Sequence, residues 1–160
     1  DLRAALDEQV QQSVQQGARV LIGGKPREGK GYFYEPTILT NVTPDMSVFS
    51  DETFGPVAAV IRVRDAEQAI ELANDSKFGL SSNLWTRNID RARELAARIE
   101  AGGVFINGMT ASDPRLPFGG VKRSGYGREL SSFGIQEFVN IQTVWIGPKV
   151  ENAPTKAASE

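Results

Sequence analysis

The chain of 160 residues contains no cysteine and no histidine, and this limits the chemistry that it can perform. Without Cys it has no disulfide, no thiolate metal site and no thiol nucleophile. Without His it lacks the commonest metal ligand and the commonest general base. A hydrolase triad built on Cys or His is therefore excluded, and we expect no metal site. Chemistry based on Lys or on carboxylates stays open.

Two short motifs carry the residues with the clearest potential for binding. The first is Glu-Thr-Phe-Gly-Pro-Val at 52–57, and the second is Pro-Phe-Gly-Gly-Val-Lys-Arg-Ser-Gly-Tyr-Gly-Arg-Glu at 117–129. The second fits neither the Walker spacing G-x-x-x-x-G-K-S/T nor the three-glycine dinucleotide fingerprint. From the residues alone, its glycines are turn-formers, Phe54 is a packed loop aromatic and Glu52 is a solvent-facing acid.

Hydrophobic periodicity and turn residues predict the elements that position these motifs. Helices are expected over 1–16, 66–74, 88–99 and 131–137, and strands over 19–22, 57–63, 80–86, 104–106 and 139–146. Asp65 and Asn88 are the expected N-caps of the two middle helices. Pro36 makes the extended stretch 32–42 an edge or irregular segment. The alternation of strands and helices along the chain predicts an α/β fold with a mainly parallel twisted sheet and flanking helices.

The composition is that of an ordinary globular domain, with 40% hydrophobic and 24% charged residues. A net charge of -2 provides no electrostatic footprint for nucleic acid or for an anionic membrane. No apolar run approaches the ~20 residues that a membrane span needs, and the acidic first residues are unlike a signal peptide. We therefore expect a cytoplasmic protein that binds neither nucleic acid nor membrane.

The two motifs, in this order and with a strand and two capped helices between them, resemble the C-terminal third of the NAD(P)-dependent aldehyde dehydrogenase superfamily. The likeness covers residues 1–147, and Asn107 before a variable loop also matches. The stretches 111–113 and 133–145 are most similar to bacterial succinate-semialdehyde dehydrogenases. This resemblance implies part of the catalytic domain over 1–137 and an oligomerisation strand over 138–147. The polar composition of 148–160, rich in Ala, Pro and Lys, predicts a disordered tail.

The resemblance also implies roles for four side chains. Glu52 would hold hydroxyls of the nicotinamide ribose of NAD or NADP, because a carboxylate accepts two hydrogen bonds. Phe54 would pack near the nicotinamide as an apolar wall. Ser112, in the loop that lines the aldehyde tunnel in the family, would help to bind a substrate carboxylate, and Phe118 would contribute to the tunnel wall. For Ser112 a second reading is open, in which it only caps a turn beside Pro114.

The reaction implied by the resemblance oxidises an aldehyde, here succinate semialdehyde, to the carboxylate through a cysteine thioester. In relatives the Cys, the general-base Glu and the main dinucleotide-binding unit lie N-terminal to the matched part. We therefore assign no catalytic residue in this chain and expect it to be inactive alone. It would work with the remaining N-terminal part in a homo-oligomer, a dimer or a tetramer. The alternative is a non-catalytic assembly module derived from the same family.

Overall fold

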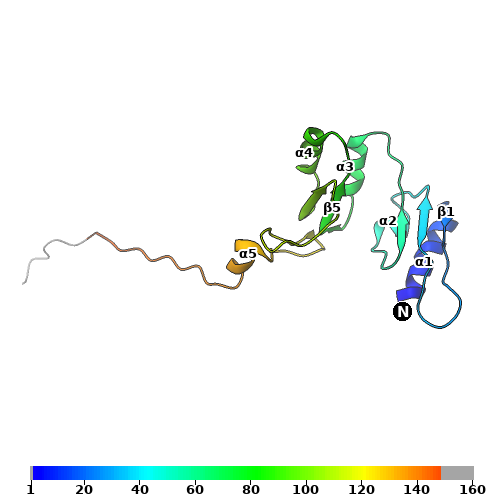
Figure 1. Cartoon of the computed structure of the whole chain (residues 1–160), viewed down its shortest axis with the longest axis horizontal. Helices are drawn as coiled ribbons and strands as arrows, with labels where there is room; N and C mark the ends of the chain where they lie inside the picture. The colour runs from blue at the N-terminus through cyan, green and yellow to red at the C-terminus, as the bar shows by residue number, and fades with distance from the viewer. Residues whose placement is uncertain (1, 149–160) are drawn as a thin grey trace, which may run out of the picture.

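The computed structural model describes residues 2–148, which form two lobes followed by an extended segment (Figure 1). The first lobe, residues 2–63, contains α1 (Leu2–Gln15), β1 (Arg19–Ile22), β2 (Thr37–Thr40), α2 (Ser47–Ser50) and β3 (Val57–Ala59). The second lobe, residues 64–137, contains α3 (Ala66–Asn74), β4 (Phe78–Gly79), β5 (Ser81–Leu84), α4 (Ile89–Ala96), β6 (Gly103–Ile106), β7 (Val121–Lys122) and α5 (Ser131–Gln136). The tail expected over 148–160 lies outside the described residues, except for residue 148.

The strands form small sheets with mixed pairing. In the first lobe β2 is central, antiparallel to β1 and parallel to β3. In the second lobe β5 pairs with β6 in parallel, and β4 pairs with β7 antiparallel. Each parallel pair is joined through a helix, as β2-α2-β3 and β5-α4-β6. The α/β class predicted from the alternation of strands and helices is confirmed, and its parallel part lies at these two crossovers.

The hydrophobic core of the first lobe contains side chains from α1, from α2 and from the central strand. Leu6 and Val10 of α1 are buried in one cluster with Leu39 of β2. The whole cluster consists of Leu6, Val10, Ala18, Tyr34, Leu39, Val42, Met46 and Val48. Leu2, the first member of the predicted apolar stripe, lies outside this core and is 65% exposed. The motif at 52–57 therefore lies in the lobe that contains this hydrophobic cluster.

The helices of the second lobe begin at the predicted caps. The Asp65 carboxylate accepts a hydrogen bond from the Gln68 backbone N–H at 2.8 Å, and the Asn88 side chain accepts one from the Arg91 N–H at 2.9 Å. Such caps satisfy N–H groups that have no partner within the helix. The buried apolar side chains of these helices are Ile70, Ala92 and Leu95.

Two expectations about strands are corrected. The strand expected over 57–63 comprises only Val57–Ala59, and its middle residue is exposed rather than buried. Pro36 predicted an edge or irregular segment, but the strand that begins at Thr37 is central in its sheet. The physical reason is that Pro36 stands just before the strand, where its missing N–H costs no ladder hydrogen bond.

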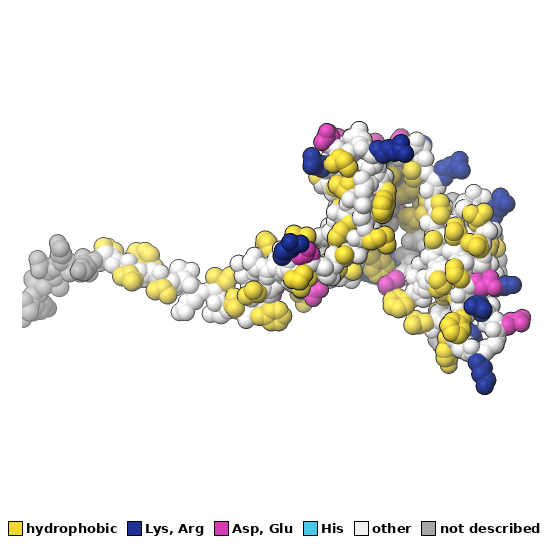
Figure 2. Space-filling view, viewed as in Figure 1, with side chains coloured by type: hydrophobic (Ala, Val, Ile, Leu, Met, Phe, Trp, Pro, Cys, Tyr) yellow, Lys and Arg dark blue, Asp and Glu magenta, His cyan; other side chains and the backbone are white. Residues whose placement is uncertain are grey.

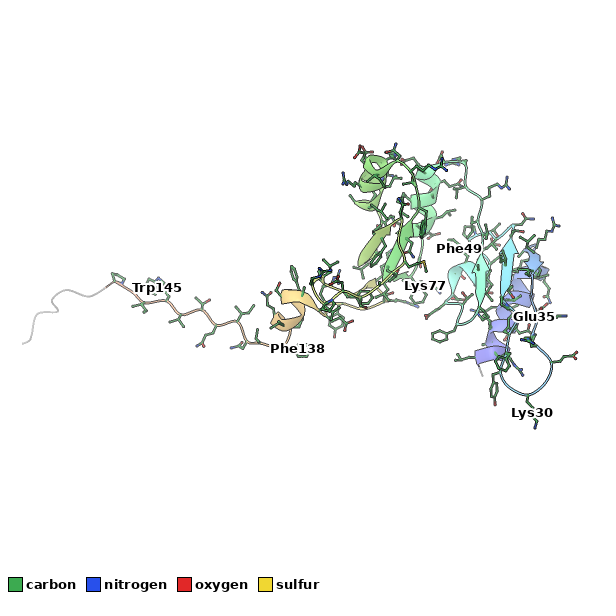
Figure 3. The ribbon with its side chains drawn as sticks, in the orientation of Figure 1. Lys30, Glu35, Phe49, Lys77, Phe138 and Trp145 are labelled. Atoms are coloured by element: carbon green, nitrogen blue, oxygen red, sulfur yellow. The ribbon has the colours of Figure 1, made fainter. Side chains whose placement is uncertain are left out.

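The segment 138–148 contains no strand pairing within the described part of the chain. It extends away from the second lobe, and its large apolar side chains, including Phe138 and Trp145, are exposed (Figures 2 and 3). The oligomerisation strand expected there stays a prediction. None of the helices described for residues 2–148 has the length and apolar character that a membrane crossing requires.

Candidate functional site

Glu52 follows α2 in a loop whose backbone is anchored while its own carboxylate is free. The N–H of Asp51 donates to the Ser47 carbonyl at 2.9 Å, which caps the short helix. The side-chain amide of Gln9, on α1, donates to the Glu52 carbonyl at 3.2 Å. The Glu52 carboxylate is exposed and makes no hydrogen bond or ion pair with any residue of the described range 2–148. Both of its oxygens can therefore accept hydrogen bonds from a ligand.

Phe54 presents its ring two residues further along the same loop. The ring is 66% exposed and lines a mostly apolar cleft of about 500 Å³. The residues around this cleft are Leu2, Arg3, Leu6, Tyr32, Tyr34, Phe54, Gly55 and Pro56. The loop approaches α1 closely at Gly55, where a Cβ would overlap the end of the Leu6 side chain. Phe54 therefore lies beside α1, where a flat ring of a ligand could stack.

A smaller cleft of about 270 Å³ contains both Glu52 and Phe54. Its other side is formed by α1 residues, among them Glu8, Gln9 and Gln12. The structure thus brings the two residues predicted to bind cofactor to one cleft, with the carboxylate and the ring on the same loop.

Ser112 lies in the loop that follows β6. Asn107 starts this loop with φ of 53°, and its side chain pairs with the Thr86 backbone through hydrogen bonds of 2.8 and 2.7 Å. Ser112 itself is exposed and has no hydrogen-bond partner among residues 2–148. The turn is capped by Asp113, whose carboxylate accepts from the Arg115 backbone N–H at 2.9 Å. The capping role considered for Ser112 is therefore filled by its neighbour.

The same carboxylate also binds the Arg115 side chain. Its oxygens accept from Arg115 Nε at 2.9 Å and from a terminal guanidinium nitrogen at 2.6 Å. These hydrogen bonds hold the pKa of Asp113 below its usual range. An ion pair between Asp113 and Arg115 therefore lies in the loop directly after Ser112.

Phe118 is half-buried and opens the Gly-rich run. Its backbone exchanges hydrogen bonds of 2.9 and 2.8 Å with Glu129, so the two ends of the run are held together. The following Gly119 lies directly on Gly102, where a Cβ would overlap the Gly119 carbonyl. Close packing of backbone, in addition to turns at Gly125 and Gly127 with positive φ, therefore explains the density of glycine. Phe118 lines a cleft of about 330 Å³ together with Leu80, Tyr126 and Phe138, among others.

The structure places two of the four predicted residues in each lobe. Glu52 and Phe54 lie together in the first lobe, whereas Ser112 and Phe118 lie in the second. The clefts lined by Phe54 and by Phe118 share no residue. Sequence reasoning missed Gln9 and Lys77, which contact the Glu52 loop over separations of 43 and 26 residues. No local pattern marks contacts of this range.

The chain belongs to the aldehyde dehydrogenase family, because residues 2–144 match the model of that family. Among curated relatives, the succinate semialdehyde dehydrogenase Sad of Escherichia coli, whose name specifies NAD(P)+, is 59% identical over 145 residues. That alignment covers 91% of this chain and 31% of the relative. The NADP(+)-dependent succinate-semialdehyde dehydrogenase 1 of Mycobacterium ulcerans is 53% identical over 91% of this chain and 32% of its own length.

Among solved structures, the succinic semialdehyde dehydrogenase of Streptococcus pyogenes, in complex with NADP+ as the cofactor, is similar with a TM-score of 0.87. It is 41% identical, and the alignment covers 92% of this chain and 32% of that chain. An aldehyde dehydrogenase of Bacillus cereus in complex with NAD+ is similar with a TM-score of 0.87, at 38% identity over 92% of this chain and 30% of that chain. The chain therefore spans about a third of the length of the relatives that it matches.

Proposed function

We propose that this chain forms the C-terminal part of an NAD(P)-dependent aldehyde dehydrogenase that oxidises succinate semialdehyde to the carboxylate. The observation that carries the proposal is the free Glu52 carboxylate beside the exposed Phe54 ring, in a chain of this family. The names of the relatives from Escherichia coli and Mycobacterium ulcerans support the choice of substrate.

The donor set of this loop fits a nicotinamide nucleotide. When bound, the nicotinamide supplies the hydride acceptor for the oxidation. Glu52 accepts hydrogen bonds from the ribose hydroxyls and so orients the nucleotide. Phe54 offers the nicotinamide an apolar face that keeps water from one side of the ring. Both residues bind and orient, and neither takes part in proton transfer.

The loop of the second lobe supplies the aldehyde side of the site. The Ser112 hydroxyl donates a hydrogen bond to the carboxylate at the far end of the substrate. The Phe118 ring forms part of the tunnel wall. Since the chain contains no Cys, the thiolate for the covalent step comes from the remaining, N-terminal part of the enzyme. The complete enzyme is a cytoplasmic homo-oligomer in this proposal.

The experiment that tests the proposal is Glu52→Gln in the complete enzyme, with the dissociation constant of NAD and NADP measured by titration calorimetry. We expect it to weaken binding about tenfold or more, because a neutral amide loses charge-assisted hydrogen bonds to the ribose. Glu71→Gln is the matched control, since Glu71 is exposed on α3 away from this loop. Unchanged affinity in the Glu52 variant would contradict the assignment.

A second function, that of a non-catalytic assembly module, is favoured by one observation, the exposed apolar side chains of segment 138–148. It requires no nucleotide affinity at all. A natural assembly that contains this chain and binds neither NAD nor NADP would support it over the enzyme.

A further inference from the structure

Lys77 contacts the Gly-rich motif and the residue that directly precedes the first motif. It lies between α3 and β4, where the second lobe faces the first (Figure 3). Its ammonium group donates to Asp51 Oδ1 at 2.7 Å, and Asp51 directly precedes Glu52. Its backbone carbonyl accepts from the Arg123 N–H at 2.9 Å, and Arg123 belongs to the Gly-rich run that Phe118 opens. One residue therefore joins the cofactor side of the site to the substrate side.

The Glu52 loop receives its other anchors from its own lobe. Gln9 of α1 holds the Glu52 carbonyl, and Ser47 of α2 holds the Asp51 N–H. Among the hydrogen bonds described for residues 51–54, the one from Lys77 is the link to the second lobe. It therefore connects the loop to the second lobe, while Gln9 and Ser47 set its local shape.

The junction between the lobes is open rather than tightly packed. A cleft of about 520 Å³ lies there, lined on one side by Phe49 and Ser50 and on the other by Lys77, Glu100 and Lys122. Lys122 is bound within its own lobe, to Glu100 at 2.8 Å and to the Asn74 carbonyl at 2.6 Å. Because apolar packing does not fill this junction, a polar contact across it has more influence on the relative placement of the motifs.

The Lys77–Asp51 pair is half-exposed, with 45% and 51% of the two side chains accessible. Pairs of this kind contribute little to overall stability, because solvent screens their attraction. A role in positioning and a role in stability can therefore be separated by experiment.

We propose that Lys77 is a positioning residue for nucleotide binding, which acts by holding the Asp51–Glu52 segment against the second lobe. This inference rests on the proposed function of Glu52. Loss of the ammonium group frees the loop from the second lobe, and the nucleotide then has to order it on binding. The contribution is made through Glu52, since Lys77 itself contacts Asp51 and not the nucleotide.

The test is Lys77→Met in the complete enzyme, which keeps the backbone hydrogen bond to Arg123 and removes the charge. We expect the dissociation constant for NAD or NADP to rise roughly three- to tenfold, with an unchanged Tm. Lys77→Arg restores the affinity, and Asp51→Asn reproduces the loss. The double variant Lys77→Met/Asp51→Asn is no weaker than either single one, because both remove the same contact. Arg93→Met is the control, since it removes a more exposed ion pair, with Asp90, that lies wholly inside α4.

The outcomes separate this inference from the proposed function. If Glu52→Gln weakens nucleotide binding and Lys77→Met does not, the positioning role is overturned and the function of Glu52 stands. If neither variant changes the affinity, both are overturned. If Lys77→Met lowers the Tm as well and its effect adds to that of Asp51→Asn, Lys77 is a general structural residue and the proposal fails.

Discussion

At the scale of the residue, Glu52 and Ser112 share one property: each is exposed and has no polar partner for its side chain within residues 2–148. The Glu52 backbone is nevertheless held by Gln9, and Ser112 directly precedes the turn that Asp113 caps. A free polar group on a fixed backbone is prepared for a ligand, because little conformational entropy is lost when the ligand binds.

For Ser112 we predict that Ser112→Leu reduces the preference of the complete enzyme for succinate semialdehyde over an uncharged aldehyde of equal length. The ratio of the two kcat/KM values should fall about tenfold, since one hydrogen bond to a charged group is lost. Met109→Leu, at an exposed position in the same loop, is the control. An unchanged ratio would show that Ser112 does not contribute to the preference for succinate semialdehyde.

At the scale of the element, α3 is joined to α4 and to the residues that follow α4 by polar contacts. The Glu67 carboxylate accepts from Arg91 at 2.9 Å and from Arg98 at 3.0 Å. The Asn74 side chain bonds the backbone of Arg98 at 2.8 Å and of Glu100 at 2.9 Å. These contacts fix the end of α3, and Lys77 follows that end by only three residues. The placement of Lys77 thus depends on the pairing of two helices.

This pairing predicts a pH dependence. The hydrogen bond from Arg98, followed by the charge of Arg98 and the contacts with Arg91, lowers the pKa of Glu67 from its ordinary value of 4.5. A group with a lowered pKa in the folded state stabilises that state above its unfolded pKa and loses this effect as the pH falls. We expect Glu67→Gln to lower the Tm slightly at about pH 7, with a difference from wild type that shrinks as the pH falls below 4.5 and vanishes once the carboxylate is protonated in the folded state as well.

Thermal unfolding of the complete enzyme without nucleotide, measured at several pH values, checks this prediction. Glu71→Gln again serves as control, because Glu71 lies on the same helix and forms no ion pair with any residue of the described range 2–148. A difference in Tm between the Glu67 variant and wild type that does not change with pH would show that these arginines do not lower the pKa of the Glu67 carboxyl group.

At the scale of the whole molecule, the two lobes are followed by an apolar segment without a partner in the described chain (Figures 1 and 2). Phe138, Ile141 and Trp145 are each more than 80% exposed, at 89%, 81% and 81%. Extended backbone with exposed apolar side chains is suited to strand addition on another subunit. This arrangement supports the proposed homo-oligomer.

We predict that truncation of the complete enzyme after residue 137 yields a smaller assembly, because the segment that would bridge subunits is removed. Light scattering after size-exclusion chromatography gives the mass of the assembly. Truncation after residue 148 is the matched control, since it retains the whole segment. The same mass for all three proteins would exclude segment 138–148 from the interface.

The part of the fold that depends on local pattern could be predicted from the sequence. Asp65 and Asn88 cap their helices as predicted, because a cap needs only residues within one turn. The central position of the strand after Pro36 could not be predicted in this way, since a strand is central or at an edge only with respect to distant neighbours. The candidate site shows the same difference between local pattern and distant contacts. The motif around Glu52 is local, whereas its anchors Gln9 and Lys77 come from far along the chain.

The sequence by itself determined the family, the α/β class and the absence of a thiol nucleophile, because each depends on the identity and order of residues. Only the tertiary structure decided that Glu52 and Phe54 share one cleft while Ser112 and Phe118 lie in the other lobe. It also decided that Asp113, and not Ser112, caps the turn, and that Lys77 links the Gly-rich motif to Asp51, the residue before Glu52. The physical reason is that these are distances between side chains, and packing of segments far apart in the chain sets such distances.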